Sequence, residues 1–398
     1  MPSRRLHILQ IFNRYLQYGG EEGSITRIGD ALEEIHDVDY FFYSTSQLKG
    51  EGIWPKLKIP WKSLHNSEVS SGLKRVQAAH HYDVWQIHNI FPAMSPVVYE
   101  LALKWKIPII HYVHNYRFAC VNGFFLNHGK PCQRCLSGNF WPAFETACWR
   151  NSRLESGWMG FITHRIRQMP LFERVFQWVA ISEAQKQEHV RMGIPADKIK
   201  VIHHFLDTEA PPLPPTKSPT AIFVGRLSLE KGVDKLLEAW KLAGGGERKL
   251  VIMGDGPERS SLEKKAKGMR GVEFVGFIAK REHRKYWQQA LFSVVPSIWK
   301  EPFGMTVLES WSNGRAVAAH AIGALPELIR DGVDGALADP ESVEDLARKL
   351  DALLSHPKQT AAMGLAGRQH LEDNFSHRRW LKEIATIYER LLTARELK

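Results

Sequence analysis

Two glutamates stand in one short segment, Glu301-Pro302-Phe303-Gly304-Met305-Thr306-Val307-Leu308-Glu309. Pro302 and Gly304 suit a tight turn into a helix, and the unpaired N–H groups at the start of that helix can bind a phosphate or sugar oxygen. Carboxylates at two depths can accept hydrogen bonds from hydroxyl groups. The segment therefore fits a sugar nucleotide, and a capped surface helix with two incidental acids is the alternative.

Two cations follow a β-branched run in Gly225-Arg226-Leu227-Ser228-Leu229-Glu230-Lys231-Gly232. Arginine can hold phosphate through two N–H groups, and lysine adds a point charge. The next expected strand ends in the turn Gly254-Asp255-Gly256-Pro257, whose glycines allow a nucleoside to approach the backbone. These turns indicate a site for a nucleoside diphosphate.

The N-terminal half offers a histidine and a glycine pair. His114 stands at the end of an apolar strand expected over residues 108–115, where ligands meet parallel sheets. His88, which ends the strand expected over 83–89, is a lesser candidate that would face an acceptor. Gly19 and Gly20 follow the first strand. Structural histidines and an ordinary turn remain the alternatives.

Strands and helices that could position these residues are expected in alternation along the chain. Short β-branched or aromatic runs alternate with amphipathic segments, which predicts parallel sheets with crossover helices. The first series of strands is expected at 6–12, 38–44, 83–89, 108–115, 175–182 and 198–204. The second is expected at 220–225, 249–253, 272–275, 291–295 and 316–319.

A proline-rich run at 211–215 separates the two series, because proline fits neither a helix interior nor a central strand. We therefore expect an N-terminal Rossmann-like domain over 1–210 and a second over 211–375. A C-terminal helix over 376–398 is expected to pack back on the first domain. Apolar stripes at helical spacing predict core-facing helices around Val233, Leu236, Leu237 and Trp240, and around Leu381, Ile384, Ala385 and Tyr388.

Composition narrows the class of protein. The chain has 398 residues, 44% of them apolar, and a net charge of +10, which favours anionic partners. The basic residues are spread along the chain, which argues against a nucleic-acid partner. There is no apolar run of membrane-spanning length and no export signal, so we expect a cytoplasmic protein.

Taken together, the motifs resemble those of the family 4 retaining glycosyltransferases. That family has the α/β GT-B fold, in which two facing Rossmann-like, doubly wound domains enclose a cleft. The resemblance is strongest in the second half and looser over 40–80 and 116–175. Ala324 and His204-Phe205 depart from the family pattern. The matching segments are Gly225-Arg226 with Glu230-Lys231-Gly232, Gly254-Asp255-Gly256-Pro257, Val275-Gly276-Phe277, Glu301 through Glu309, and Gly323-Ala324-Leu325-Pro326-Glu327.

The resemblance implies a role for each site residue. Arg226 and Lys231 would hold the donor diphosphate, Glu301 the hydroxyls of the transferred sugar, and Glu309 the ribose. His114 would complete the catalytic set of His114, Glu301, Arg226 and Lys231. The implied donor-binding residues are Gly19, Gly20, Gly225, Arg226, Lys231, Gly254, Gly256, Phe277, Ile278, Glu301, Phe303, Gly304, Met305 and Glu309.

The implied activity is metal-independent, retaining transfer of a hexose-type sugar from a UDP- or GDP-sugar to a saccharide or lipid-linked saccharide. No cofactor is required, and the pathway expected is envelope, lipopolysaccharide or exopolysaccharide biosynthesis. A nucleotide-sugar epimerase or a phosphorylase of the same architecture is an alternative. A non-catalytic scaffold that binds sugar nucleotides is another.

Two segments lie outside these motifs. Cys120, Cys132, Cys135 and Cys148 have spacings compatible with a structural zinc site, with free thiols or a redox-sensitive pair as alternatives. Residues 140–178 are rich in tryptophan and arginine. That segment fits either a surface that lies on an anionic membrane, at the inner face of the cell membrane, or a core helix pair with solvated arginines.

Overall fold

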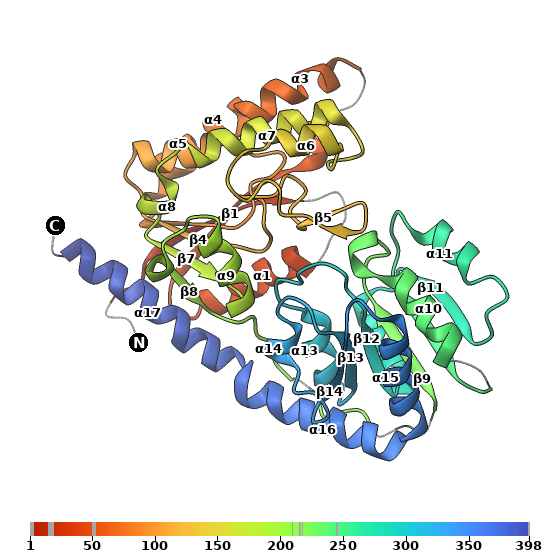
Figure 1. The fold of residues 1–398 in the computed structure, drawn as a ribbon. Helices are drawn as coiled ribbons and strands as arrows, with labels where there is room; N and C mark the ends of the chain where they lie inside the picture. The colour runs from red at the N-terminus through yellow and green to blue at the C-terminus, as the bar shows by residue number, and fades with distance from the viewer. Residues whose placement is uncertain are drawn as a thin grey trace. The chain divides into compact units, whose positions relative to one another are not determined.

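The computed structural model describes residues 4–14, 20–49, 53–208, 210–214, 216, 218–243 and 246–396. The chain divides into two compact units. Unit 1 comprises Met1–His128, Cys132–His203 and Leu381–Lys398, and unit 2 comprises Gly129–Pro131 and His204–Trp380. Each unit contains a six-stranded parallel sheet (Figure 1).

The sheet of unit 1 has the strand order β2-β1-β3-β4-β7-β8. Its middle strands are buried along their whole length because helices cover both faces. Trp85, Tyr112 and Trp178 are among the largest fully buried side chains. The strands are β1 (His7–Arg14), β2 (Asp37–Ser44), β3 (Val84–Ile87), β4 (Ile109–Tyr112), β7 (Gln177–Ala180) and β8 (Ile199–Val201).

The helices of unit 1 begin at recognisable caps. The Asn66 side chain accepts hydrogen bonds from the N–H groups of Glu68 and Val69 at the start of α4, and Ser152 caps α7 in the same way. Between β4 and α7 the chain forms α6 and the two-residue strand β5 (Leu126–Asn127) in unit 1, and the two-residue strand β6 (Lys130–Pro131), which belongs to unit 2. The helices are α1 (Gly20–Leu32), α2 (Thr45–Lys49), α3 (Ile53–Leu64), α4 (Ser67–His80), α5 (Val97–Lys104), α6 (Trp141–Thr146), α7 (Arg153–Arg167), α8 (Leu171–Arg174) and α9 (Glu183–Arg191).

The sheet of unit 2 has the strand order β11-β10-β9-β12-β13-β14. Figure 1 shows α10 (Val233–Ala243) beside α15 (Val343–Ser355), and both helices contribute to one buried cluster with the sheet. The predicted stripe of Val233, Leu236, Leu237 and Trp240 is buried there. The strands are β9 (Thr220–Val224), β10 (Lys249–Met253), β11 (Val272–Gly276), β12 (Phe292–Val295), β13 (Ala316–His320) and β14 (Gly335–Ala338).

Two of the remaining helices of unit 2, α13 and α16, pack very closely against each other. A Cβ at Gly367 would lie 2.1 Å from the ring of Trp311, so only glycine allows α13 and α16 to pack this closely. These helices are α11 (Arg259–Lys265), α12 (His283–Gln289), α13 (Met305–Ser312), α14 (Leu325–Leu328) and α16 (Pro357–Asn374).

The last helix, α17 (His377–Glu396), begins in unit 2 and continues in unit 1. Within unit 1, Ile384 and Tyr388 are fully buried. The Lys200 ammonium donates to the Glu383 carbonyl at 3.1 Å, and Arg395 pairs with Asp83. Among the described residues, no helix is both long and apolar enough to cross a membrane.

The prediction of two Rossmann-like α/β sheets is confirmed. Several strands end earlier than expected. β3 ends at Ile87 and β4 at Tyr112, which leaves His88 and His114 in the loops that follow. β14 was not predicted, because its Gly-Ala-Leu-Ala sequence lacks the β-branched residues that indicate a strand.

Candidate functional site

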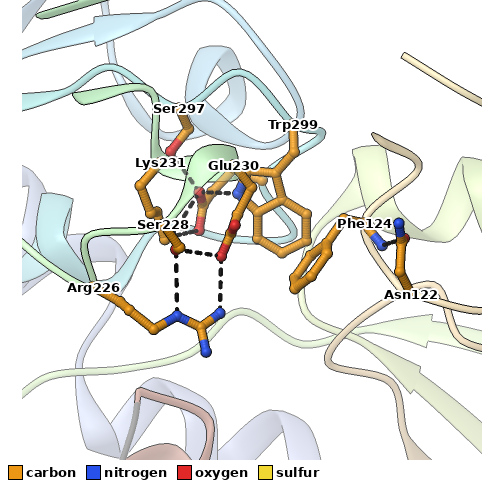
Figure 2. Close-up of polar contacts among 9 residues, drawn as sticks. Asn122, Phe124, Arg226, Ser228, Glu230, Lys231, Ser297 and Trp299 are labelled. Atoms are coloured by element: carbon orange, nitrogen blue, oxygen red, sulfur yellow. Dashed lines mark hydrogen bonds and ion pairs between the residues drawn. The ribbon is translucent and has the colours of Figure 1, made fainter. Parts of the chain in front are cut away.

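Arg226 lies in the turn after β9 and is held by a small polar cluster (Figure 2). Its Nη2 donates to Glu230 Oε1 at 2.8 Å, and its Nε donates to Ser228 Oγ at 3.3 Å. The Ser228 hydroxyl also donates to Glu230 Oε1 at 2.7 Å. Burial alone would raise the pKa of Glu230, but the Arg226 charge and the Ser228 hydroxyl outweigh it and lower that pKa. About half of the Arg226 side chain, 53%, stays exposed, so its guanidinium is within reach of a ligand.

Lys231 and Glu301 form the centre of the site in unit 2. Lys231 Nζ donates to both carboxylate oxygens of Glu301, at 3.0 and 3.1 Å. The Ser297 hydroxyl and the Trp299 indole N–H each donate to Glu301 Oε2 at 2.8 Å. Glu301 is only 7% exposed, so Lys231 balances its charge, and Ser297 and Trp299 supply hydrogen bonds in place of water.

A glycine keeps the backbone of Glu301 in place. A Cβ at Gly323 would lie 2.4 Å from both the N and the O atoms of Glu301. Gly323 also has φ +61°, a conformation that glycine adopts readily. The next residue, Ala324, donates its N–H to the Glu301 carbonyl at 2.9 Å. The segment Gly323-Ala324 therefore holds the backbone of Glu301.

Two further glycines join the turns after β9 and β10. A Cβ at Gly254 would lie 1.8 Å from the Gly225 carbonyl oxygen, and one at Gly256 would lie 2.3 Å from that of Leu227. The Gly225 N–H also donates to the Met253 carbonyl at 3.0 Å. Because β9 and β10 are parallel neighbours, the structure brings Gly225, Gly254 and Gly256 together at the edge where Arg226 lies.

The other predicted donor-binding residues of unit 2 lie on neighbouring elements. Gly304, with φ +111°, precedes α13, which starts at Met305 and carries Glu309 in its second turn, partly buried. Phe303 is buried, and its ring lies 5.2 Å from that of His204. Phe277 follows β11 and is 75% exposed, whereas the next residue, Ile278, is partly buried. An exposed ring at a strand end is available for stacking.

In unit 1, His114 and His88 form a stacked pair. Their rings lie 5.1 Å apart, and His88 Nδ1 lies 2.8 Å from His114 Nε2. Burial lowers the pKa of His114 to about 3, so the ring is neutral near pH 7. Gly20 is the first residue of α1, whereas Gly19 lies outside the described residues.

The sequence interpretation missed Glu21, in the first turn of α1. Burial raises the pKa of Glu21 to about 7, even though hydrogen bonds from Asn89 and Asn115 and the Arg117 charge act to lower it. Asn89, Asn115 and Arg117 line one cavity of unit 1 together with His88 and His114. Glu21 directly follows the glycine pair, and a carboxylate at that place was the available signal.

The structural zinc site at the four cysteines stays a prediction. Within the described residues, no group of three or more His, Cys, Asp or Glu side chains could hold a metal ion, and all four cysteines are free thiols. Cys120 donates its S–H to Asn122 Oδ1 at 3.0 Å. Burial and, after it, the neighbouring Cys120, Cys148 and Cys132 raise the pKa of Cys135 to about 12, and burial with Cys120 and Cys132 nearby raises that of Cys148 to about 11. The four thiols therefore lie close enough to affect one another's charge.

The tryptophan- and arginine-rich segment combines features of both interpretations. Met159, Ile162 and Ile166 of α7 are buried, as in a core helix. The same segment leaves large apolar side chains exposed, and α3 adds one more. They are Trp61 (72%), Trp141 (61%), Leu154 (80%) and Phe161 (46%).

Two family models match consecutive parts of the chain. The model described as Glycosyltransferase Family 4 matches residues 18–210, and the model described as Glycosyl transferases group 1 matches residues 207–370. An uncharacterized glycosyltransferase of Methanocaldococcus jannaschii is 36% identical over 138 residues, which is 34% of this chain and 35% of that protein. The matched part spans about a third of the length of the first curated relatives.

Solved structures resemble the chain over nearly its whole length. Sucrose-phosphate synthase from Thermosynechococcus elongatus aligns with a TM-score of 0.74 and 19% identity, covering 98% of this chain and 100% of that one. HepE from Anabaena, in complex with UDP-glucose, aligns with a TM-score of 0.69 and 18% identity over 97% of this chain and 100% of that one. At these identities the similarity is one of fold.

Proposed function

The chain belongs to the glycosyltransferases described by the family 4 and group 1 models, and we propose that it is a retaining hexosyltransferase. It transfers a sugar from a UDP- or GDP-sugar to a saccharide or lipid-linked saccharide, in envelope, lipopolysaccharide or exopolysaccharide biosynthesis. The proposal rests on the ion pair of Lys231 with the buried Glu301, together with Arg226, which pairs with Glu230 in the same turn after β9. HepE, a protein of similar fold, was crystallised with UDP-glucose, which fits a donor of this class.

In this proposal the two cations of unit 2 hold the donor diphosphate. When the glycosidic bond to the diphosphate breaks, negative charge grows on the leaving oxygens. Lys231, whose side chain is 26% exposed, exchanges part of its contact with Glu301 for a phosphate oxygen, and Arg226 adds a bidentate contact. Fixed cations stabilise that charge as a metal ion does in other enzymes, so the reaction needs no divalent ion.

The two glutamates hold the two ends of the donor. Glu301, oriented by Ser297 and Trp299, accepts hydrogen bonds from the hydroxyls of the sugar. Glu309 accepts from the ribose hydroxyls. The nucleoside lies along the glycine turns and near the strand end at Phe277 and Ile278. The residues assigned to that donor-binding surface are Gly225, Gly254, Gly256, Phe277, Ile278, Phe303, Gly304 and Met305.

The acceptor hydroxyl attacks the sugar on the face that the diphosphate leaves, and a phosphate oxygen of the donor takes its proton. The stereochemistry is retained without a covalent enzyme intermediate. The neutral ring of His114 forms a hydrogen bond with a hydroxyl group of one of the substrates. Gly20, the first residue of α1, contacts the donor phosphates through its backbone.

A panel of nucleotide sugars tests the proposal. The protein is incubated with UDP-, GDP- and ADP-sugars, with and without lipid-linked saccharides isolated from membranes, and free nucleotide is measured. We expect release that depends on acceptor and on one nucleoside. An epimerase would instead convert the donor without any acceptor. Binding of the nucleotide without turnover, for every donor and acceptor, would leave only the scaffold alternative.

We further propose that the protein associates peripherally with anionic membranes through α7 and the neighbouring helices. Leu154 and Phe161 expose apolar side chains beside the exposed Arg153 and Arg165, the combination that favours an anionic interface. Sedimentation with phosphatidylglycerol vesicles should fall several-fold in Phe161→Ser. Leu242→Ser, which removes an exposed apolar side chain of unit 2, is the matched control and should leave sedimentation unchanged.

A further inference from the structure

Unit 1 contains a row of buried polar side chains that crosses its sheet. Gln10 of β1 and Gln86 of β3 are opposite each other in the parallel pairing, and both are completely buried. His88 is 2% exposed and Tyr388 of α17 is completely buried. Polar groups in a sheet core cost stability unless hydrogen bonds satisfy them. We therefore ask which hydrogen bonds these side chains make and which residue they hold in place.

The four side chains form a continuous chain of hydrogen bonds that ends at His114. The Tyr388 hydroxyl donates to Gln86 Oε1, and Gln86 Nε2 donates to Gln10 Oε1 at 3.2 Å. His88 Nε2 lies 2.8 Å from Gln10 Oε1. His88 Nδ1 lies 2.8 Å from His114 Nε2.

The chemistry of these atoms decides which nitrogen of His88 and of His114 carries a proton. An amide oxygen only accepts, so the 2.8 Å contact with Gln10 Oε1 requires a proton on His88 Nε2. In a neutral ring that leaves His88 Nδ1 without a proton, and His114 Nε2 must then donate to it. The 3.3 Å approach of Gln86 Nε2 to His88 Nε2 carries no hydrogen bond, because both atoms bear hydrogen.

We propose that Gln10, Gln86, His88 and Tyr388 are positioning residues that hold His114 as the tautomer protonated on Nε2. His114 Nδ1 is then the accepting atom of the ring, which suits a hydroxyl donor on a sugar and not a phosphate oxygen. The role of His114 in transfer rests on the proposed function, whereas its tautomer does not. Burial, which lowers the pKa of His114 to about 3, keeps the ring neutral and so preserves this direction.

Long-range ¹H–¹⁵N spectra of protein labelled on histidine nitrogens test the tautomer directly. The His114 signals are identified by their loss in His114→Gln. We expect wild-type protein to show a protonated Nε2 and an unprotonated Nδ1 at pH 7. A proton on Nδ1 of His114 in the wild type would overturn the proposal, whatever the protein's transferase activity.

Two variants of His88 separate positioning from packing. His88→Phe keeps a ring to stack on Tyr112, whose centroid lies 5.2 Å from that of His88, but removes both hydrogen bonds. We expect a mixture of His114 tautomers and about 10-fold lower kcat with little change in the donor KM, the effect of losing one well-placed hydrogen bond. His88→Gln can donate to Gln10 and accept from His114, so it should restore both the tautomer and most of kcat.

The far end of the row is tested with tyrosine variants. Tyr388→Phe removes the hydroxyl that donates to Gln86, and a smaller fall in kcat, of about 3-fold, is expected. Tyr82→Phe is the matched control, because Tyr82 is also buried and loses one hydrogen bond, to Asp39 at 2.8 Å, outside the row. If Tyr82→Phe and His88→Phe lower kcat equally, with the His114 tautomer unchanged in both, the row serves stability alone and the proposal is wrong. A predicted tautomer in a protein without transferase activity would instead contradict the proposed function.

Discussion

Units 1 and 2 both contain a six-stranded parallel sheet, but the residues at their strand ends differ in charge. In unit 2 the side chains are ionic and paired, Lys231 with Glu301 and Arg226 with Glu230. In unit 1 the rings of His88 and His114 are joined by a hydrogen bond and burial keeps His114 neutral, while the ion pair of Arg14 with Glu22 lies at the end of β1. Paired charges can be exchanged for the charges of a diphosphate, whereas neutral rings suit hydroxyl groups. In the proposed function, the two sheets therefore contribute to two chemically different parts of the reaction.

The largest effect is expected from removing the cations of unit 2. Arg226→Ala or Lys231→Ala should lower turnover about 100-fold or more, because each removes a charge that stabilises the leaving diphosphate. Lys235→Ala is the matched control, since Lys235 pairs with Glu238 on the surface of α10. Near-normal turnover in the double variant of Arg226 and Lys231 would show that the charges of unit 2 do not stabilise the leaving diphosphate.

The next effect separates the two glutamates of unit 2. Glu309→Gln should weaken binding of bare UDP or GDP about 10-fold or more, because a hydrogen bond to a charged group contributes about 1.5–3 kcal/mol. Glu301→Gln should mainly slow the chemical step and leave that affinity nearly unchanged. Titration calorimetry with the bare nucleotide measures both. Equal weakening in the two variants would show that their roles are misassigned.

The neutral histidines of unit 1 predict a smaller, pH-dependent effect. Burial lowers the pKa of His111 to about 3 and those of His36 and His189 to about 4, from an ordinary value of about 6.5. Below pH 6.5 the unfolded chain therefore binds more protons, so the stability present at pH 7 is lost as the pH falls toward 4.

Thermal unfolding at pH 7, 6, 5 and 4 measures this effect. His189→Gln should reduce the fall in Tm between pH 7 and pH 4 by about 2–4 °C, the shift that corresponds to about 1 kcal/mol.

Glu21 has the opposite effect on stability, because its pKa is raised to about 7 and its stabilising contribution is lost as the pH rises from 4.5 to 7. Glu21→Gln should therefore raise the Tm at pH 7 relative to pH 4. A Tm profile of His189→Gln parallel to that of the wild type would contradict the assignment.

The smallest effect is expected from chelation. Protein treated with EDTA and then dialysed should keep its transferase rate within about 2-fold, because Arg226 and Lys231 supply the charge that a metal would supply. Circular dichroism before and after treatment controls for the fold. A loss of rate that magnesium or manganese specifically restores would show that the cations of unit 2 are not sufficient.

The fold was largely predictable from local sequence patterns. The apolar strands and the stripe from Val233 to Trp240 each fall within one short window of sequence. β14, made of glycine, alanine and leucine, gave no such pattern. The end of a strand was also hard to predict, because the apolar run continues past the last paired residue, as after Tyr112.

The contacts within the sites could not be predicted in the same way. Lys231 and Glu301 are 70 positions apart and meet because β9 and β12 are neighbours in the sheet, an order that sequence patterns leave open. The buried row in unit 1 did leave a signal, since Gln10 and Gln86 are polar residues inside apolar strands. Their hydrogen bonds depend on the register of β1 with β3, which only the structure supplies.

We propose that Arg226 and Lys231 of unit 2 bind the nucleoside diphosphate through their charge, whereas the neutral His114 of unit 1 does not contribute to this binding. Titration calorimetry of bare UDP and GDP into Lys231→Ala and His114→Gln tests it most directly. We predict that Lys231→Ala weakens the preferred nucleotide about 10-fold or more, because a charged contact to phosphate is lost. His114→Gln should leave the affinity within about 2-fold of the wild type. An unchanged affinity in Lys231→Ala, or equal weakening by both variants, would show that the charge of Lys231 does not bind the nucleotide in this way.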